Sequence, residues 1–198
     1  MKRMLLGVCL LALAAPLPAA AQSVEDDLDM EAKEIAIKTA VMAAPPLLRD
    51  DATVIRLDNE GEYEVLREGT NNLVCWDRSD EPGRAFSVQC TNMDNIARIQ
   101  QNRAWNMSGK TQDEIAAMRA EAEENGTREL SKFGSVYYTV SGQDMTAIRL
   151  HMTIAVPFAT SESLGIPDNE EGGGEYRKAG AYVMEVGTSS AHIMLPGR

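Results

Sequence analysis

Alternating apolar and polar residues mark several short segments as strands of a sheet with one buried face. Residues 52–58 and 62–67 show this pattern on either side of a turn at 59–61, which predicts a hairpin. The most regular alternation runs from Ile148 to Val156, where every second residue is apolar. Further strands are expected at residues 73–77, 86–90, 136–140, 181–186 and 191–195.

An N-terminal helix is predicted over residues 23–41. Its first turns carry four acidic residues, which suit the positive end of the helix dipole. Apolar side chains that include Ile35 and Ala36 fall on one face, and Pro45 and Pro46 mark where the helix must end.

A pair of helices is predicted between the fourth and fifth strands. The first covers 93–105, and the second begins at Thr111, where Glu114 completes a capping box, and closes at Gly126. Residues 159–176 are expected to form a long loop. This order of elements predicts an α+β fold: a mostly antiparallel sheet with an N-terminal helix and a central helix pair.

The first 21 residues have the pattern of a secretory signal peptide. Lys2 and Arg3 precede an apolar run that ends in small residues before Gln22, the expected first residue after cleavage. The run is shorter than the roughly 20 apolar residues of a spanning helix, and no later segment is apolar enough for one. We therefore expect an exported protein, periplasmic or extracellular, in which 22–198 form a single α+β domain.

Two cysteines follow the predicted cleavage site, Cys75 and Cys90. An even number of cysteines in an oxidising compartment favours a disulfide, and strand spacing turns both side chains toward one face. A redox-active pair is usually separated by two residues, and a metal site needs more ligands nearby. A structural disulfide is therefore the favoured interpretation.

The chain is acidic, with 30 acidic and 19 basic residues and a formal net charge of −11. The predicted signal holds two basic and no acidic residues, so its removal takes the charge from −11 to −13. No run of basic residues remains. Nucleic acid and anionic membrane surfaces are therefore not expected as partners, and the sequence specifies no other partner.

His192 and Met194 have the clearest potential for metal chemistry. Alternate residues of a strand project from one face about 6–7 Å apart, so these two side chains could bind one copper ion. His151 is a further candidate ligand. In the competing interpretation the methionines fill the core, His192 is a hydrogen-bonded interior residue, and no cofactor is bound.

A hydrolase with an atypical site is a further alternative. The G-x-S-x-G motif of serine hydrolases is absent, because Ala191 follows Ser190 where the second glycine would stand. Two histidines permit a triad only in principle. No residue is therefore predicted to be catalytic.

The stretch R-E-G-T-N at 67–71, followed by three residues and Cys75, and the terminal run A-H-I-M-L-P are the most distinctive motifs. With them the chain resembles a family of small exported bacterial proteins that has no assigned activity. The resemblance implies export and brings no substrate or cofactor. Arg67, Glu68 and Asn71 are candidate binding residues, although charged side chains beside such a turn usually bond to local backbone.

These features together predict an exported, non-catalytic domain that binds a ligand or has a role in the cell envelope. A copper-binding protein that uses His192 and Met194 is the first alternative. A hydrolase is the second.

Overall fold

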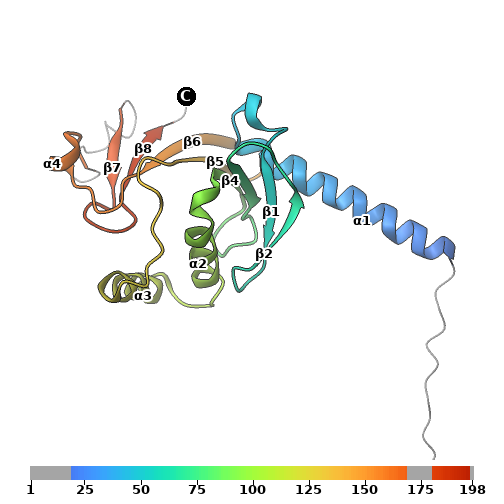
Figure 1. Ribbon diagram of the computed structural model, residues 1–198, viewed down its shortest axis with the longest axis horizontal. Helices are drawn as coiled ribbons and strands as arrows, with labels where there is room; N and C mark the ends of the chain where they lie inside the picture. Colours follow the sequence, from blue (N-terminus) through green and yellow to red (C-terminus); the bar gives the residue numbers. More distant parts are fainter. Residues whose placement is uncertain (1–18, 169–179, 197–198) are drawn as a thin grey trace, which may run out of the picture. The chain divides into compact units, whose positions relative to one another are not determined.

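The computed structural model describes residues 19–168 and 180–196 (Figure 1). Most of the predicted signal and the acidic, glycine-rich segment 169–179 lie outside these ranges. The chain divides into two compact units between Glu34 and Ile35. Helix α1 (Ala19–Ala40) begins four residues before the predicted helix, so the predicted cleavage point at Gln22 falls within it.

The larger unit contains a mostly antiparallel sheet of eight strands in the described residues, with the order β2-β1-β3-β4-β5-β6-β8-β7. Every neighbouring pair is antiparallel except β1 and β3, which run parallel. The described residues also form four α-helices, and this combination of helices and sheet confirms the predicted α+β fold. The strands are β1 (Thr53–Leu57), β2 (Tyr63–Arg67), β3 (Leu73–Asp77), β4 (Phe86–Asn92), β5 (Val136–Gly142), β6 (Ile148–Ala155), β7 (Tyr182–Met184) and β8 (His192–Pro196).

The parallel pairing of β1 and β3 requires the chain to cross from one side of β1 to the other after β2. Gly69 lies at this crossing, where a Cβ atom would stand 2.3 Å from the Thr53 nitrogen and 2.4 Å from the Asp51 oxygen. The same Asp51 carbonyl accepts hydrogen bonds from the backbone N–H groups of Thr70 and Asn71. Only glycine fits this close approach of two backbones.

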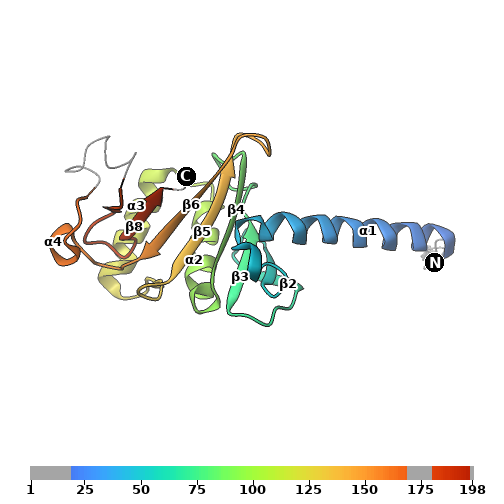
Figure 2. The ribbon, with the colours of Figure 1, turned by 90° about the horizontal axis from the view of Figure 1, so that it is seen from above.

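Helices α2 (Ile96–Asn106) and α3 (Gln112–Asn125) form the predicted central pair and lie on the same face of the sheet (Figures 1 and 2). The capping box of Thr111 and Glu114 is confirmed, and Gly126 ends α3 with φ 75°. The predicted loop 159–176 instead contains a short helix, α4 (Ser161–Leu164). A second capping box at its start stabilises this single turn.

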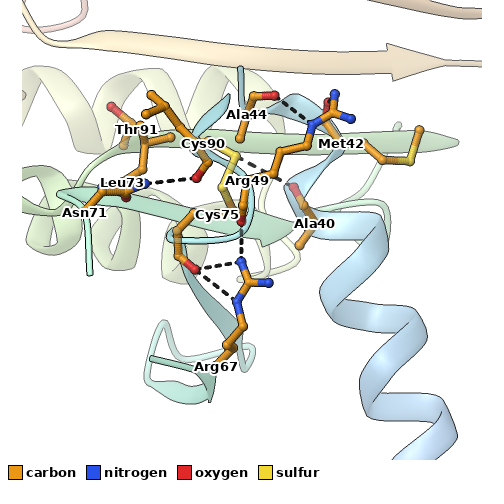
Figure 3. The surroundings of a disulfide bond; sticks show 12 residues. Ala40, Met42, Ala44, Arg49, Arg67, Asn71, Leu73, Cys75, Cys90 and Thr91 are labelled. Carbon is orange, nitrogen blue, oxygen red and sulfur yellow. Dashed lines mark hydrogen bonds between the residues drawn. A yellow bond between two sulfur atoms is a disulfide. The ribbon is translucent and has the colours of Figure 1, made fainter. Parts of the chain in front are cut away.

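The disulfide between Cys75 and Cys90 is confirmed and lies on the sheet face opposite α2 (Figure 3). The two cysteines are direct partners on β3 and β4, and both are completely buried. Figure 3 shows the end of α1 beside them, with the Cys90 sulfur 3.7 Å from the Ala40 carbonyl oxygen. The core on this face includes Val54, Val88 and the short helical turn Val41–Ala43 that follows α1.

The predicted apolar face of the N-terminal helix is only partly confirmed. Ala36 packs against the core that surrounds the disulfide, whereas Ile35 is 57% exposed. Ile37 and Ala40, in the last turn of α1, complete the contact with this core. Helical apolar spacing therefore correctly marks Ala36 as a core contact but does not mean that Ile35 is buried.

Candidate functional site

A hollow lined by arginines lies on the helix side of the sheet. Its larger lobe, of about 390 Å³, opens over β4, β5, β6 and β8, and a smaller lobe of about 230 Å³ extends toward Trp105 of α2. We call the two lobes together the arginine hollow. The residues common to both lobes are Arg78, Arg84, Arg98, Asn102, Arg119 and Ser190.

Strand alternation builds a polar floor beneath the larger lobe. Residues that are paired across neighbouring strands share a face, so the register forms rows of side chains across the sheet. One row runs from Gln89 through Thr139 to His151, and the Gln89 amide donates to the Thr139 hydroxyl at 2.8 Å. A second row joins Thr153 to Met194.

Arg98 of α2 is a buried cation that is held by neutral acceptors. Only 5% of the residue is exposed. Its guanidinium donates to the Glu129 carbonyl at 2.8 Å, to the Ser190 hydroxyl at 2.9 Å and more weakly to Ser189. These bonds fix the group at the centre of the hollow without neutralising it.

Arg128, which follows α3, is held in a similar way and is 7% exposed. It donates to the side chains of Gln101, Asn102 and Ser189, and its guanidinium lies 4.5 Å from the centroid of the Trp105 ring. The stacked ring supports the cation but supplies no negative charge.

Neither of these cations has a carboxylate partner within 4.0 Å in the part of the chain that the structure describes. Burial lowers the pKa of Arg98 to about 10. Burial also lowers the pKa of Arg128 to about 9, and the positive charges of Arg98 and Arg119 add to this effect. A bound anion would relieve both the desolvation and the repulsion.

Arg78 and Arg84 both lie in the loop between β3 and β4, and they share one buried carboxylate. Glu81 accepts from the Arg78 guanidinium at 2.7 Å and from Arg84 Nε at 2.8 Å. The terminal nitrogens of Arg84 make no hydrogen bond to described residues, and Arg84 is part of the lining of the hollow. Glu81 therefore holds the two arginines in place and leaves part of Arg84 available to a ligand.

Arg119 of α3 is weakly paired. Its closest carboxylate oxygen, on Glu185, is 3.7 Å away. Its buried Nε atom has no hydrogen-bond partner among the described residues. That atom is enclosed by protein, whereas the terminal nitrogens of Arg119 make no hydrogen bond to described residues, and Arg119 lines the hollow. These terminal nitrogens are the donors that a ligand oxygen could use.

Five guanidinium groups thus line the hollow, at positions 78, 84, 98, 119 and 128. Three carboxylates lie near them: Glu81, Glu185 and Glu123, whose oxygen accepts from the Ser189 N–H. These eight side chains together carry two more positive than negative charges. This basic site in a chain of net charge −11 was missed in the sequence, which has no run of basic residues to signal it.

The structure brings together the three residues predicted to have metal-binding potential. His151, His192 and Met194 all line the larger lobe, and His192 Nδ1 lies 2.8 Å from the Ser190 carbonyl oxygen. Burial, His192 and the positive charge of Arg78 lower the pKa of His151. Neither imidazole is hydrogen-bonded to a hydroxyl in the described residues, and the hydrolase alternative stays a prediction.

The candidate residues Arg67, Glu68 and Asn71 lie away from the arginine hollow. The Arg67 guanidinium donates to the carbonyls of Arg49 and Ala52, at 2.5 and 2.9 Å, and the Asn71 amide donates to the Leu48 carbonyl at 2.9 Å. Figure 3 shows Arg67 and Asn71 on the disulfide side of the fold. The Glu68 side chain is exposed. The observed contacts of Arg67 and Asn71 hold the chain crossing near Gly69.

Among the described residues, no helix combines the length and apolar character needed to cross a membrane. The same residues contain no group of three or more histidine, cysteine or acidic side chains placed to hold a metal ion. Comparison of the chain with protein-family models, curated proteins and solved structures finds no match. The resemblance to an exported bacterial family stays a prediction.

Proposed function

We propose that this chain is an exported, non-catalytic protein that binds a small anionic molecule in the arginine hollow. The observation that carries the proposal is the burial of Arg98 and Arg128 without a carboxylate partner in the described residues. A buried charge is strongly disfavoured unless a charge of opposite sign accompanies it. Glu123 acts on both cations and Glu185 on Arg98, but neither carboxylate pairs with them directly. A bound anion would supply the opposite charge at contact distance.

The guanidinium donors that make no hydrogen bond to described residues, on Arg84 and Arg119, favour an anionic ligand over a neutral one. Guanidinium groups bind carboxylate and phosphate oxygens with two parallel hydrogen bonds, which are stronger than those between neutral groups. Arg84 and Arg119 retain such donors, while Arg78, Arg98 and Arg128 are fixed around them. The hollow is therefore already arranged for an anion.

The charge of the remaining surface favours a small ligand over an anionic polymer. The whole chain has a net charge of −11, so an extended polyanion that enters the hollow would also meet repulsion from the rest of the surface. A small anion enters the local positive field alone. This agrees with the expectation that nucleic acid and anionic membranes are not partners.

Export is supported by the disulfide and by the N-terminal pattern. Buried disulfides such as Cys75–Cys90 are typical of oxidising compartments. We assign no catalytic role to the two histidines, which line the hollow together with its arginines. A ligand-binding protein in the periplasm or outside the cell accounts for both features.

Isothermal titration calorimetry of the processed protein with inorganic phosphate, sulfate and succinate tests the proposal. We expect at least one of these anions to bind, and Arg119→Gln to weaken that binding about tenfold or more, because it removes charged donors. Arg56→Gln is the matched control, since Arg56 is exposed on β1 and pairs with Glu64 outside the hollow. Absence of binding by all three anions, or equal losses in the two variants, would contradict the proposal.

Copper binding is a second candidate, because His151, His192 and Met194 line the same lobe. Against it stands the excess of positive charge around the lobe, which repels a cation. Competition for Cu(I) with a chromophoric chelator decides between the two ligands. Binding that His192→Ala abolishes, in a variant with an unchanged thermal transition, would favour copper over the anion.

A further inference from the structure

The floor of the arginine hollow carries hydrogen-bonding groups that a bare anion does not use. His151, Ser141 and Thr153 are half-buried on β5 and β6, and their side chains make no hydrogen bond to other described residues. The register places these groups on the same face as Thr139 and Gln89. The floor therefore offers donors and acceptors at several adjacent positions.

The spacing of these groups suits a ligand with several hydroxyls. Paired residues on neighbouring strands stand about 5 Å apart, and alternate residues along one strand about 7 Å apart. Ser141, Thr139, His151 and Thr153 occupy such positions on two adjacent strands. A hydroxyl of the ligand can both donate and accept, so it can pair with either a serine or threonine oxygen or an imidazole nitrogen.

The excess of positive charge favours a ligand that carries more than one negative charge. Five guanidinium groups and three carboxylates together carry two more positive than negative charges. A phosphate monoester has a charge of about −1.5 to −2 at pH 7 and three acceptor oxygens. A single carboxylate would neutralise only one of the two charges.

We infer that the arginine hollow binds the phosphate monoester of a sugar or other polyol. Its phosphate lies against Arg84, Arg98 and Arg119, and its hydroxyls lie over the floor formed by Ser141, Thr153 and His151. This inference rests on the proposed function and adds the class of ligand. It uses both the charge of the hollow and the polar groups of the floor that make no hydrogen bond to described residues.

Calorimetry with a matched pair of ligands tests the inference. Glucose 6-phosphate and cyclohexylmethyl phosphate have similar shapes and the same phosphate, but only the first carries ring hydroxyls. We expect glucose 6-phosphate to bind at least tenfold more tightly than cyclohexylmethyl phosphate, and glucose alone not to bind at millimolar concentration. The phosphate supplies the charge interaction in both esters, whereas the floor distinguishes them.

Thr153→Val removes one floor hydroxyl without changing the shape of the side chain. We expect it to weaken glucose 6-phosphate binding about fivefold, the effect of one neutral hydrogen bond, and to leave cyclohexylmethyl phosphate unchanged. The control is Thr70→Val, an exposed threonine at the chain crossing that does not line the hollow. The selective loss distinguishes a contact with the ligand from a general effect on folding.

The outcomes separate this inference from the proposed function. If phosphate or sulfate binds but the two esters bind equally well, the polyol class is wrong and anion binding stands. Tighter binding of succinate than of glucose 6-phosphate would replace the phosphate ester by a dicarboxylate. If no anion binds, both the inference and the proposed function fail.

Discussion

His151 lies half-buried on the floor of the hollow, where burial, His192 and Arg78 lower the pKa of its imidazole. In the unfolded chain the same imidazole titrates near pH 6.5. Between the folded pKa and 6.5 the unfolded state therefore binds more protons than the folded state. The stabilisation from a neutral His151 is complete above about pH 6.5 and is lost as the pH falls through the folded pKa.

His151→Gln should reduce this pH dependence, because glutamine stays neutral. We expect the free energy of unfolding of the wild-type protein to fall more steeply than that of the variant below pH 6.5, and the two curves to run parallel above it. Urea unfolding at a series of pH values between 4.5 and 8 measures the difference. Parallel curves over the whole range would show that His151 does not titrate differently in the folded state.

Arg103 has a structural role, in contrast to the arginines of the hollow. It is 3% exposed, donates to the carbonyls of Leu57 and Asp58, and forms two hydrogen bonds to the Asp80 carboxylate, at 2.5 and 2.6 Å. These bonds join α2 to the ends of β1 and β3. Their loss would leave the carbonyl of Leu57 buried with one partner fewer.

Arg103→Met should lower the free energy of unfolding by roughly 2–4 kcal/mol, since it removes several buried hydrogen bonds and one charged pair. Arg56→Met is the comparison, because the pair of Arg56 with Glu64 is exposed on both sides and is expected to contribute less than about 1 kcal/mol. Chemical denaturation of both variants measures the two losses. Equal losses would mean that the contacts of Arg103 contribute no more than a surface pair.

At the scale of single residues, the sequence identified the histidines of the hollow but not its arginines. His151, His192 and Met194 were candidates because imidazole and thioether groups are common metal ligands. Arg98 and Arg128 come from segments 30 residues apart in the chain and are buried by packing between α2, α3 and the loop before β8. Local sequence carries no signal for contacts between segments so far apart.

The secondary-structure elements were largely predictable where one pattern determines one element. The alternation around Ile148 corresponds to β6, and the capping box at Thr111 corresponds to the start of α3. The parallel pairing of β1 with β3 was not foreseen, because alternation shows which face of a strand is buried but not which strand lies beside it. Glycine is required at position 69, where the chain crosses, but a glycine in the sequence does not show which two strands pair.

The disulfide between β3 and β4 should resist reduction while the protein is folded. Both cysteines are completely buried, so a thiolate can attack only after the strands open. We expect dithiothreitol to leave the bridge intact in native buffer and to reduce it rapidly in denaturing urea. Thiol alkylation followed by intact mass measurement reports the two states. Rapid reduction in native buffer would show that this part of the sheet opens easily.

The whole molecule combines an acidic composition with a hollow lined by arginines. The chain has a net charge of −11 and no run of basic residues along its sequence. Neither property reveals that arginines from separate segments line one hollow. The fold gathers arginines from α2, α3 and two loops at one place. The net charge of a chain is therefore a poor guide to the charge of a ligand that enters a small site.

Native mass spectrometry of the protein, recovered from the periplasm or the culture medium, tests signal cleavage, the disulfide and ligand binding together. We expect a polypeptide that begins at Gln22 and is two hydrogens lighter than the reduced chain, because the signal is removed and the bridge is formed. A bound adduct in the mass range of a small phosphate ester, lost in Arg119→Gln, would link the recovered protein to the hollow. A chain that keeps residues 1–21 would contradict processing by cleavage.

The disulfide also has a consequence for the opposite face of the sheet. Side chains alternate along a strand, so a slip of β4 against β3 by one residue would turn every side chain of β4 over. Because Cys75 and Cys90 are direct partners, the covalent bond between them forbids that slip. Gln89, the neighbour of Cys90, is thereby kept on the side of Arg78 and Thr139. The disulfide lies on the opposite face from the hollow, yet it determines which side chains of β4 line the hollow.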